Sequence, residues 1–107
     1  MVKHINGEQL EELITHTDKP VFCDFWANWC GPCRMLGPVF EAASNKYEDK
    51  AIFVKIDVDE DGSEVAARKY QISSIPNVLV FKNGALAGNN LGFMPQEAFE
   101  KFVEKYL

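Results

Sequence analysis

Apolar residues follow two different periods along this chain. Apolar positions three and four residues apart predict helices, whereas alternating positions or short apolar runs predict strands. After a weak first strand, the patterns predict a helix from Asn6 to the loop at 16–20, a strand at 21–27, a helix from about 30 to 47, a strand at 52–58, a helix at 63–70, strands at 77–82 and 85–91, and a helix from 95 to 106. The predicted order is therefore β-α-β-α-β-α-β-β-α.

Local signals mark the ends of several of these elements. Asn6, followed three residues later by Gln9, forms a capping-box pattern at the start of the first helix. The pair Asn83-Gly84 between two strand patterns predicts a tight hairpin, and Pro95 suits the first turn of the last helix. We expect the short helix at 63–70 to bury Val65, Ala66 and Tyr70.

The alternation of strands and helices indicates an α/β fold. Strand–helix–strand connections require right-handed parallel crossovers, and the hairpin adds antiparallel strands. We therefore expect a central mixed β-sheet of about five strands flanked by about four helices. A chain of 107 residues corresponds to a single domain, 1–107.

Composition and charge argue against several classes of protein. Apolar residues make up 47% and charged residues 25%, which is typical of a folded globular protein and not of a disordered one. The net charge is −5 and the basic residues are scattered, so nucleic acid and anionic membranes are poor candidate partners. No segment approaches the roughly 20 apolar residues of a membrane span.

The cysteines point to chemistry rather than to a scaffold. The first eight residues contain no apolar signal core, so we expect a cytoplasmic protein in which thiols stay reduced. The chain has three cysteines, an odd number, and two of them are three residues apart. Small secreted proteins that rely on disulfides tend to use even numbers of cysteines.

The segment Cys30-Gly31-Pro32-Cys33 follows a buried strand and opens a helix. Cysteines at i and i+3 of a first helical turn lie on one face, close enough to form a small disulfide ring. Cys30 at the helix start faces unpaired N–H groups and the positive end of the helix dipole, which favour the thiolate and lower its pKa. Cys33 lies one turn further in, is expected to be less exposed, and can attack a mixed disulfide formed at Cys30. The implied chemistry is two-step thiol–disulfide exchange.

Two other interpretations of the cysteine pair remain open. A zinc site needs about four ligands, and the other candidates, Cys23, His4 and His16, show no second paired spacing. A purely structural disulfide would close a loop of only four residues, which constrains the unfolded chain little.

The sequence also resembles the thioredoxin family over almost its whole length. The resemblance is carried by Phe25-Trp26-Ala27-Asn28-Trp29-Cys30-Gly31-Pro32-Cys33-Arg34, by Asp24 before it, and by Lys55-Ile56-Asp57-Val58-Asp59, Ser74-Ile75-Pro76, Phe81-Lys82-Asn83-Gly84 and Gly92. It implies the thioredoxin fold and reduction of protein disulfides by Cys30 as nucleophile and Cys33 as resolving thiol. A lowered pKa of the first cysteine is itself a known property of this family, not an independent prediction.

The resemblance also implies partners. Electrons would come from NADPH through a separate flavoprotein, thioredoxin reductase, and the clients would be proteins that contain disulfides. No cofactor is expected in this chain, because the G-x-G-x-x-G pattern of a nucleotide site is absent. We expect a monomer, although thiol-dependent dimers stay open.

Asp24 is an acid inside an apolar strand, where burial should raise its pKa. It is either a structural carboxyl satisfied by hydrogen bonds, with Lys55 among the possible partners, or, as the resemblance implies, the proton acceptor for Cys33. Strongly shifted acids cluster near reactive sites, which favours the second interpretation. Lys55 itself is either part of the site or a strand lysine that extends to water.

A second group of residues is implied in binding clients. The resemblance implies a cis bond between Ile75 and Pro76, which would set the Ile75 backbone beside the sulfurs to pair with an extended client. The alternative is a trans proline that opens the strand. Gly92 would allow a close backbone approach, or be an ordinary turn glycine. The expected binding surface consists of Trp29, Gly31, Pro32, Ile75, Pro76, Gly92 and Phe93.

Three further features of the sequence do not involve the cysteine pair. Cys23 should point away from Asp24 and act as an inert core residue rather than a regulatory thiol. The acidic turn 57–62 opens like a calcium loop, but Arg68 occupies its twelfth position, where a glutamate is needed. Asn77, where the family commonly has threonine, and the bulky pair Phe93-Met94 depart from the family pattern beside the expected docking surface.

Two rival functions are compatible with this sequence. An oxidase or isomerase of the same fold often carries histidine where this chain has Pro32, and its redox potential would be oxidising. A binding module would use the fold to hold a partner, with the thiols incidental.

Overall fold

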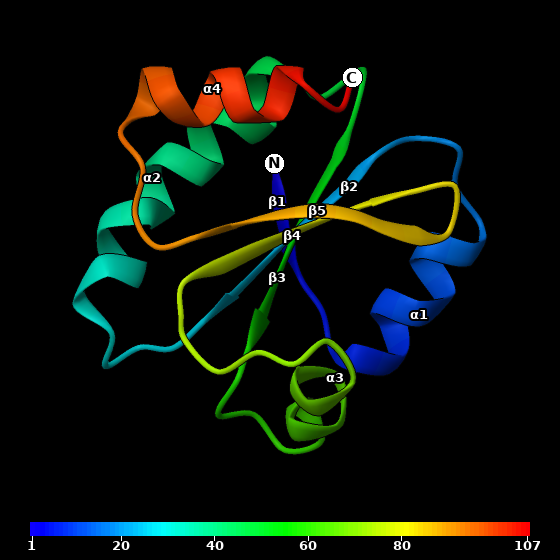
Figure 1. The fold of residues 1–107 in the computed structure, drawn as a ribbon, viewed down its shortest axis with the longest axis vertical. Helices are drawn as coiled ribbons and strands as arrows, with labels where there is room; N and C mark the ends of the chain where they lie inside the picture. The colour runs from blue at the N-terminus through cyan, green and yellow to red at the C-terminus, as the bar shows by residue number, and fades with distance from the viewer.

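The computed structural model describes all 107 residues and contains the nine elements in the predicted order. They are β1 (Val2–His4), α1 (Gly7–Thr15), β2 (Val21–Trp26), α2 (Gly31–Lys46), β3 (Ile52–Asp57), α3 (Ser63–Lys69), β4 (Asn77–Lys82), β5 (Ala85–Leu91) and α4 (Gln96–Glu104), as Figure 1 shows. No helix has the length and apolar character that would let it cross a bilayer.

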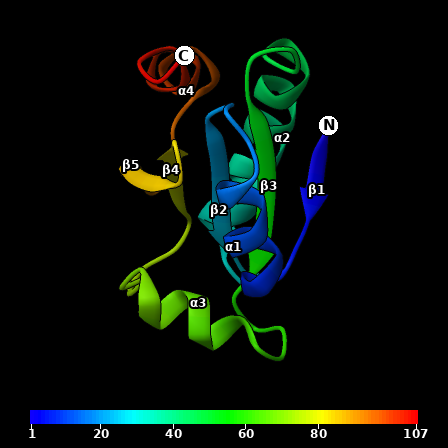
Figure 2. The same cartoon turned by 90° about the vertical axis from the view of Figure 1, so that its right-hand side faces the viewer.

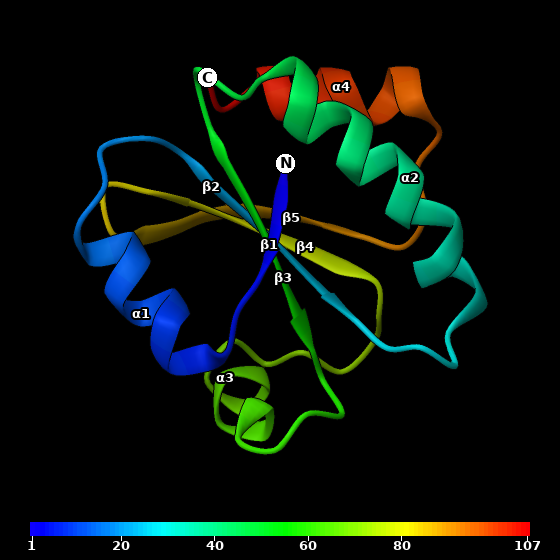
Figure 3. The same cartoon turned by 180° about the vertical axis from the view of Figure 1, so that it is seen from behind.

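The five strands form one mixed sheet in the order β1-β3-β2-β4-β5. Strand β3 lies parallel to both β1 and β2, whereas β4 is antiparallel to β2 and to β5. Figure 2 shows this order directly, with β1 and β5 at opposite edges. Helices α2 and α4 cover one face of the sheet and α1 and α3 the other, as the front and back views agree (Figures 1 and 3).

The local signals in the sequence form the expected structures. The Asn6 side chain accepts a hydrogen bond from the Gln9 backbone N–H at 2.8 Å, and the Gln9 side chain accepts one from the Asn6 N–H at 2.9 Å. Asn83 and Gly84 both have positive φ, 53° and 80°, as a type I′ hairpin turn requires. These two predictions are confirmed.

The core is divided between the two faces of the sheet. Alternate residues of a strand point to opposite faces, so Phe22 of β2 packs beneath α2 and α4 while Cys23 and Phe25 pack beneath α1 and α3. By the same alternation Asp24 points to the face of Phe22, which is the face that α2 covers. The sheet therefore brings an acid beneath the helix that carries the cysteine pair.

Two expectations need correction. Val65 is not an inner residue: it is 62% exposed, because a helix of two turns presents one narrow face, and Ser63 and Ala66 occupy it. Pro95 is not inside the first turn of α4 but is its N-cap, with extended backbone. Its side chain cannot cap the helix, so the chain turns into α4 without a side-chain hydrogen bond.

Candidate active site

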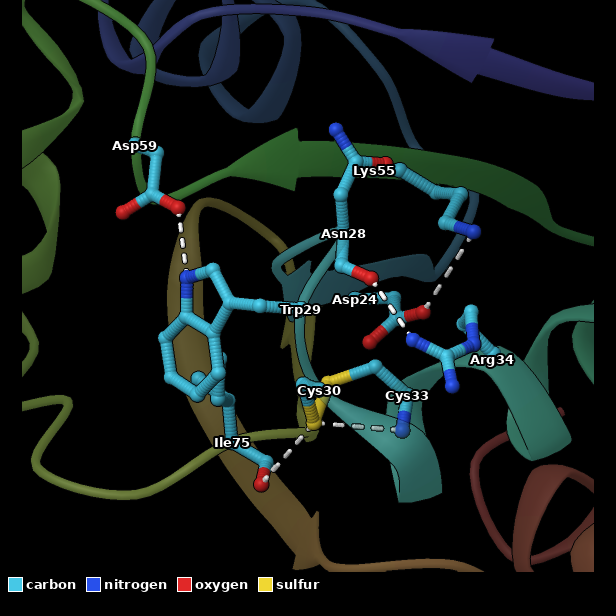
Figure 4. Close-up of a disulfide and its surroundings, with 9 residues drawn as sticks. All are labelled: Asp24, Asn28, Trp29, Cys30, Cys33, Arg34, Lys55, Asp59 and Ile75. Atoms are coloured by element: carbon cyan, nitrogen blue, oxygen red, sulfur yellow. Dashed lines mark hydrogen bonds and ion pairs between the residues drawn. A yellow bond between two sulfur atoms is a disulfide. The ribbon is translucent and has the colours of Figure 1, made fainter.

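The cysteine pair occupies the N-terminus of α2. Cys30 is the N-cap and is bonded to Cys33 as a disulfide, with the two Cα atoms 5.2 Å apart (Figure 4). The Cys33 backbone N–H points at the Cys30 Sγ at 3.2 Å. This donor is one of the unpaired N–H groups of a helix N-terminus, where negative charge is stabilised. Geometry that favours a thiolate at Cys30 is therefore built into the backbone.

The two sulfurs differ in their access to solvent. Cys33 is completely buried, whereas Cys30 retains 6% exposure. Both pack with Ala27, and Trp26, Val58 and Ile75 lie against the group. The expectation that the second cysteine is the less exposed one is confirmed, and only Cys30 can be reached by another protein.

The loop before Cys30 is held by a residue that sequence reasoning did not single out. The Arg34 guanidinium donates to the Asn28 carbonyl at 2.9 Å, and the Cys30 N–H donates to the Ala27 carbonyl at 3.2 Å. Arg34 thus closes a ring from the first turn of α2 back to the loop (Figure 4). No spacing rule predicts this contact, because it depends on how the loop folds.

Trp29 projects from the site and is 69% exposed. Its indole Nε1–H donates to the Asp59 carboxylate at 2.7 Å, and Asp57 in turn accepts from the Asp59 backbone N–H at 2.9 Å. The acidic turn that resembles a calcium loop therefore anchors an aromatic side chain. Sequence reasoning missed this function of Asp59, because the partners are 30 residues apart.

Asp24 is completely buried, and neither of its carboxylate oxygens has a hydrogen-bond partner. Lys55 is its lateral neighbour on β3, with the ammonium nitrogen 4.0 Å from the carboxylate. Burial raises the pKa of Asp24 to about 7, and the nearby Lys55 charge opposes that rise. Within the protein, the ion pair with Lys55 is thus the polar contact of the Asp24 carboxyl.

Lys55 does not extend freely into water. Its side chain is only 14% exposed, and its ammonium nitrogen lies 4.4 Å from the centre of the Trp26 ring. In Figure 4 the Lys55 ammonium and the Asp24 carboxyl face one another on the sheet side of the disulfide. The interpretation of Lys55 as a solvated strand lysine is wrong.

Ile75 and Pro76 lie beside the disulfide. Their peptide bond is cis, and the Ile75 carbonyl oxygen lies 3.8 Å from the Cys30 Sγ (Figure 4). The Gly92 N–H donates to the Pro76 carbonyl at 2.7 Å, and Gly92 has a φ of 92°, which favours glycine. Three of the expected surface residues, distant in sequence, are thus linked to the sulfurs through backbone contacts.

The other residues of the expected binding surface are accessible to a partner. Phe93 is 40% exposed, Pro32 is exposed and Gly31 is half-buried. Asn77, the departure from the family pattern, is buried and accepts from the Asn89 side chain at 3.1 Å. Its side chain carries a cross-strand contact between β4 and β5.

The third cysteine is separate from the site. Cys23 is a free, buried thiol on the α1–α3 face of the sheet, opposite to Asp24. Burial raises its pKa well above the ordinary thiol value, and the Asp24 charge adds to this. Nowhere in the structure do three or more His, Cys, Asp or Glu side chains gather as a metal site would require.

Comparison with known proteins identifies the family. The thioredoxin family profile matches residues 1–105. The chain is 41% identical over 106 residues to the chloroplastic M-type thioredoxin of Pisum sativum, 41% over 104 residues to the thioredoxin of Mycoplasmoides gallisepticum, and 47% over 87 residues to the thioredoxin of Bacillus subtilis. These alignments cover 99%, 96% and 81% of this chain, and 60%, 100% and 82% of the respective relatives. With its mixed five-stranded sheet and a Cys-Gly-Pro-Cys disulfide heading α2, the chain belongs to the thioredoxin family of thiol–disulfide oxidoreductases.

Proposed function

We propose that the chain reduces disulfides in client proteins, with Cys30 as the attacking and Cys33 as the resolving sulfur. The observation that carries this proposal is the asymmetry of the pair. Cys30 keeps some exposure and faces a helix N–H donor, whereas Cys33 is sealed behind it. A thiolate at Cys30 is stabilised for attack, and the buried Cys33 is protected from every sulfur except the one bonded to Cys30.

The reaction takes place in two balanced steps. The Cys30 thiolate attacks one client sulfur, forms a mixed disulfide, and breaks the client S–S bond to release a client thiolate. Cys33 then loses its proton and attacks the Cys30 sulfur, which forms the Cys30–Cys33 disulfide and releases the second client thiolate. Two electrons pass from the cysteine pair to the client, and the disulfide in the structure is the oxidised product.

We assign to Asp24 the role of proton acceptor for Cys33 in the second step. Its pKa of about 7 allows it to take and release a proton near neutral pH, and it lies on the sheet face that α2 covers. The proton passes directly or through water. Lys55 stabilises the charged form of the carboxylate from 4.0 Å.

The client docks on the surface around the Cys30 sulfur. Trp29, Phe93 and Ile75 supply apolar contacts, and Gly31 and Pro32 border the sulfur. The backbone of Ile75, which precedes Pro76, pairs with an extended client segment. Gly92 keeps the neighbouring backbone close to Pro76. A short, mostly apolar surface of this kind suits partners that bind transiently.

By resemblance to the family, the electrons that restore the dithiol come from NADPH through thioredoxin reductase. We place the protein in the cytoplasm, where the thiol pool keeps such a pair reduced. We expect it to work as a monomer, because each chain contributes a complete cysteine pair and its own Asp24.

Insulin-disulfide reduction in the presence of NADPH and thioredoxin reductase tests this proposal. We expect Cys30→Ser to lose all activity and Cys33→Ser to accumulate a mixed disulfide with the client, detectable by mass spectrometry. Cys23→Ala is the matched control, since it removes a cysteine outside the site and should leave the rate near wild type. Full reduction by Cys30→Ser would disprove the proposal.

Two further measurements separate the rivals. A redox titration of the Cys30–Cys33 pair should give a reducing potential; an oxidising one would support the oxidase or isomerase. A double Cys30→Ser, Cys33→Ser variant that kept full biological activity would instead favour the binding module.

A further inference from the structure

Three ionisable side chains form a row across the sheet, from its edge to the buried acid. His4 of β1 is the register partner of Lys55 on β3, and Lys55 is the register partner of Asp24 on β2. Register partners on adjacent strands point to the same face. Because β1 is the edge strand beside β3 (Figures 2 and 3), the row runs from the exposed His4 to the fully buried Asp24.

Trp26 contacts two members of this row, His4 and Lys55. The His4 ring meets the Trp26 ring edge to face, with centroids 5.9 Å apart and planes at 67°. The Lys55 ammonium nitrogen lies 4.4 Å from the same ring. The Trp26 side chain also packs against Ala27, Cys30 and Cys33, so ring contacts on several sides set its orientation.

The position of the Lys55 ammonium depends on this indole. At 4.0 Å from the Asp24 carboxylate, the ammonium makes an ion pair but no hydrogen bond with it. A long, flexible lysine side chain would gain hydration by turning outward. The attraction of the cation to the Trp26 ring opposes that movement and keeps the charge beside the carboxylate.

We propose that His4 is a positioning residue for the acid of the redox site: its ring braces Trp26, and Trp26 holds the Lys55 ammonium 4.0 Å from Asp24. This inference rests on the proposed role of Asp24 for its importance in the reaction, but not for its effect on the carboxyl itself. His4 contacts neither sulfur nor client and acts only through its neighbours.

The groups around Asp24 determine how a movement of the Lys55 ammonium would change the Asp24 pKa. Lys55 is the charged group that acts on the carboxyl pKa. Helix α2 brings Cys30 and Cys33, which carry no charge as a disulfide, and β4 presents the neutral Val78 in register. On its own strand, Cys23 points to the opposite face. If the indole loosens and the ammonium moves outward, the attraction that stabilises the carboxylate weakens and the Asp24 pKa rises.

The test is a titration of the Asp24 carboxyl by carbon-13 NMR in the oxidised full-length protein. The variants are His4→Ala, His4→Phe and Lys55→Met, the last of which removes the charge outright. We expect His4→Ala to raise the Asp24 pKa by about half a unit or more, in the same direction as Lys55→Met. His4→Phe keeps an aromatic ring against Trp26, so its Asp24 carboxyl should titrate as in the wild type.

In the reduced protein, the pH dependence of mixed-disulfide resolution should shift upward with His4→Ala and stay in place with His4→Phe.

Every other outcome overturns the inference. If His4→Ala titrates like wild type, the ring does not position Lys55. If His4→Ala and His4→Phe shift equally, the imidazole charge rather than the ring acts on Asp24. If Lys55→Met does not shift the Asp24 pKa, the ammonium does not act on the carboxyl, and His4 cannot act through it. Failure of the proposed function would look different, because an inactive proton acceptor would leave the carboxyl titration intact while Asp24→Asn failed to change the reaction rate.

Discussion

Asp24 is the residue with the most unfavourable surroundings in the molecule. A charged carboxylate in a protein interior is strongly destabilising, and the ion pair to Lys55 at 4.0 Å compensates only part of that penalty. The neutral acid is easier to bury, which is why the pKa rises to about 7. A carboxyl that titrates near neutral pH is suited to proton transfer at a reactive site.

Asp24 should therefore contribute to the pH dependence of stability. The folded pKa of about 7 lies above the ordinary value of 3.8, so the folded protein binds more protons between these values. The contribution of Asp24 to the free energy of unfolding should be highest below about pH 4, fall as pH rises, and level off above pH 7, with a total loss on the order of 4 kcal/mol. Asp24→Asn should remove this decline and be the more stable protein at neutral pH, as urea unfolding across pH would measure.

The same variant tests the role of the acid in the reaction. Asp24→Asn should slow the reduction of client disulfides, because Cys33 loses its proton acceptor. Asp18→Asn, an exposed loop carboxyl, is the control and should change neither the rate nor the pH dependence of stability. An Asp24→Asn protein with the wild-type rate at every pH would remove the acid from the mechanism.

At the scale of elements, local sequence signals set where a helix begins, whereas contacts between elements set how it packs. Helix α1 begins with the capping box of Asn6 and Gln9, which the sequence displays. Gly7 directly follows Asn6, and only the tertiary structure explains why glycine occupies this position. A Cβ atom on Gly7 would lie 2.8 Å from the Ala66 Cβ of α3, so glycine allows the two helices to approach.

Gly7→Ala should destabilise the protein, although alanine is normally the better helix former. We expect a loss of about 1–3 kcal/mol from overpacking against α3, measured by urea unfolding. Glu8→Ala, at the neighbouring exposed position, should stay within about 0.5 kcal/mol of wild type.

Ala66→Gly combined with Gly7→Ala should recover part of the loss, because it removes the atom that is crowded. Simple additivity of the two substitutions would show that the contact does not matter.

At the scale of the whole molecule, the sheet has a hydrophobic core on each face, and the helix that carries the redox site packs on one of them. Phe40 of α2 contacts Phe53 of β3, with centroids 5.4 Å apart, and Phe99 of α4 at 5.8 Å. On the same face, Tyr47 donates a hydrogen bond to Glu104, which ties α2 to α4, and on the other face Tyr70 donates to Glu11, which ties α3 to α1. The helix that carries the cysteines is thus anchored to the sheet and to α4.

Phe40→Ala should therefore affect the entire fold. We expect a loss of about 3–5 kcal/mol in the free energy of unfolding, because the ring is fully buried between α2, β3 and α4. Met35→Ala lies on the same helix but is 59% exposed, and it should change stability by no more than about 0.5 kcal/mol. Similar losses in both variants would contradict the packing assigned to α2.

Patterns confined to a few neighbouring residues are visible in the amino-acid sequence alone. The capping box at Asn6, the turn at Asn83-Gly84 and the order of nine elements could be predicted because each depends on residues at most four positions apart. The cysteine pair belongs to this group, since a spacing of three at a helix start already brings two sulfurs to one face.

Contacts across the sheet and between loops were decided only by the tertiary structure. Trp29 bonded to Asp59, Lys55 directed at Asp24, and His4 against Trp26 join residues 22 to 31 positions apart. Their meeting depends on strand order, register and loop path, which no local spacing encodes. The exposure of Val65 shows the same limit, because which face of a short helix is buried depends on where the neighbouring elements lie.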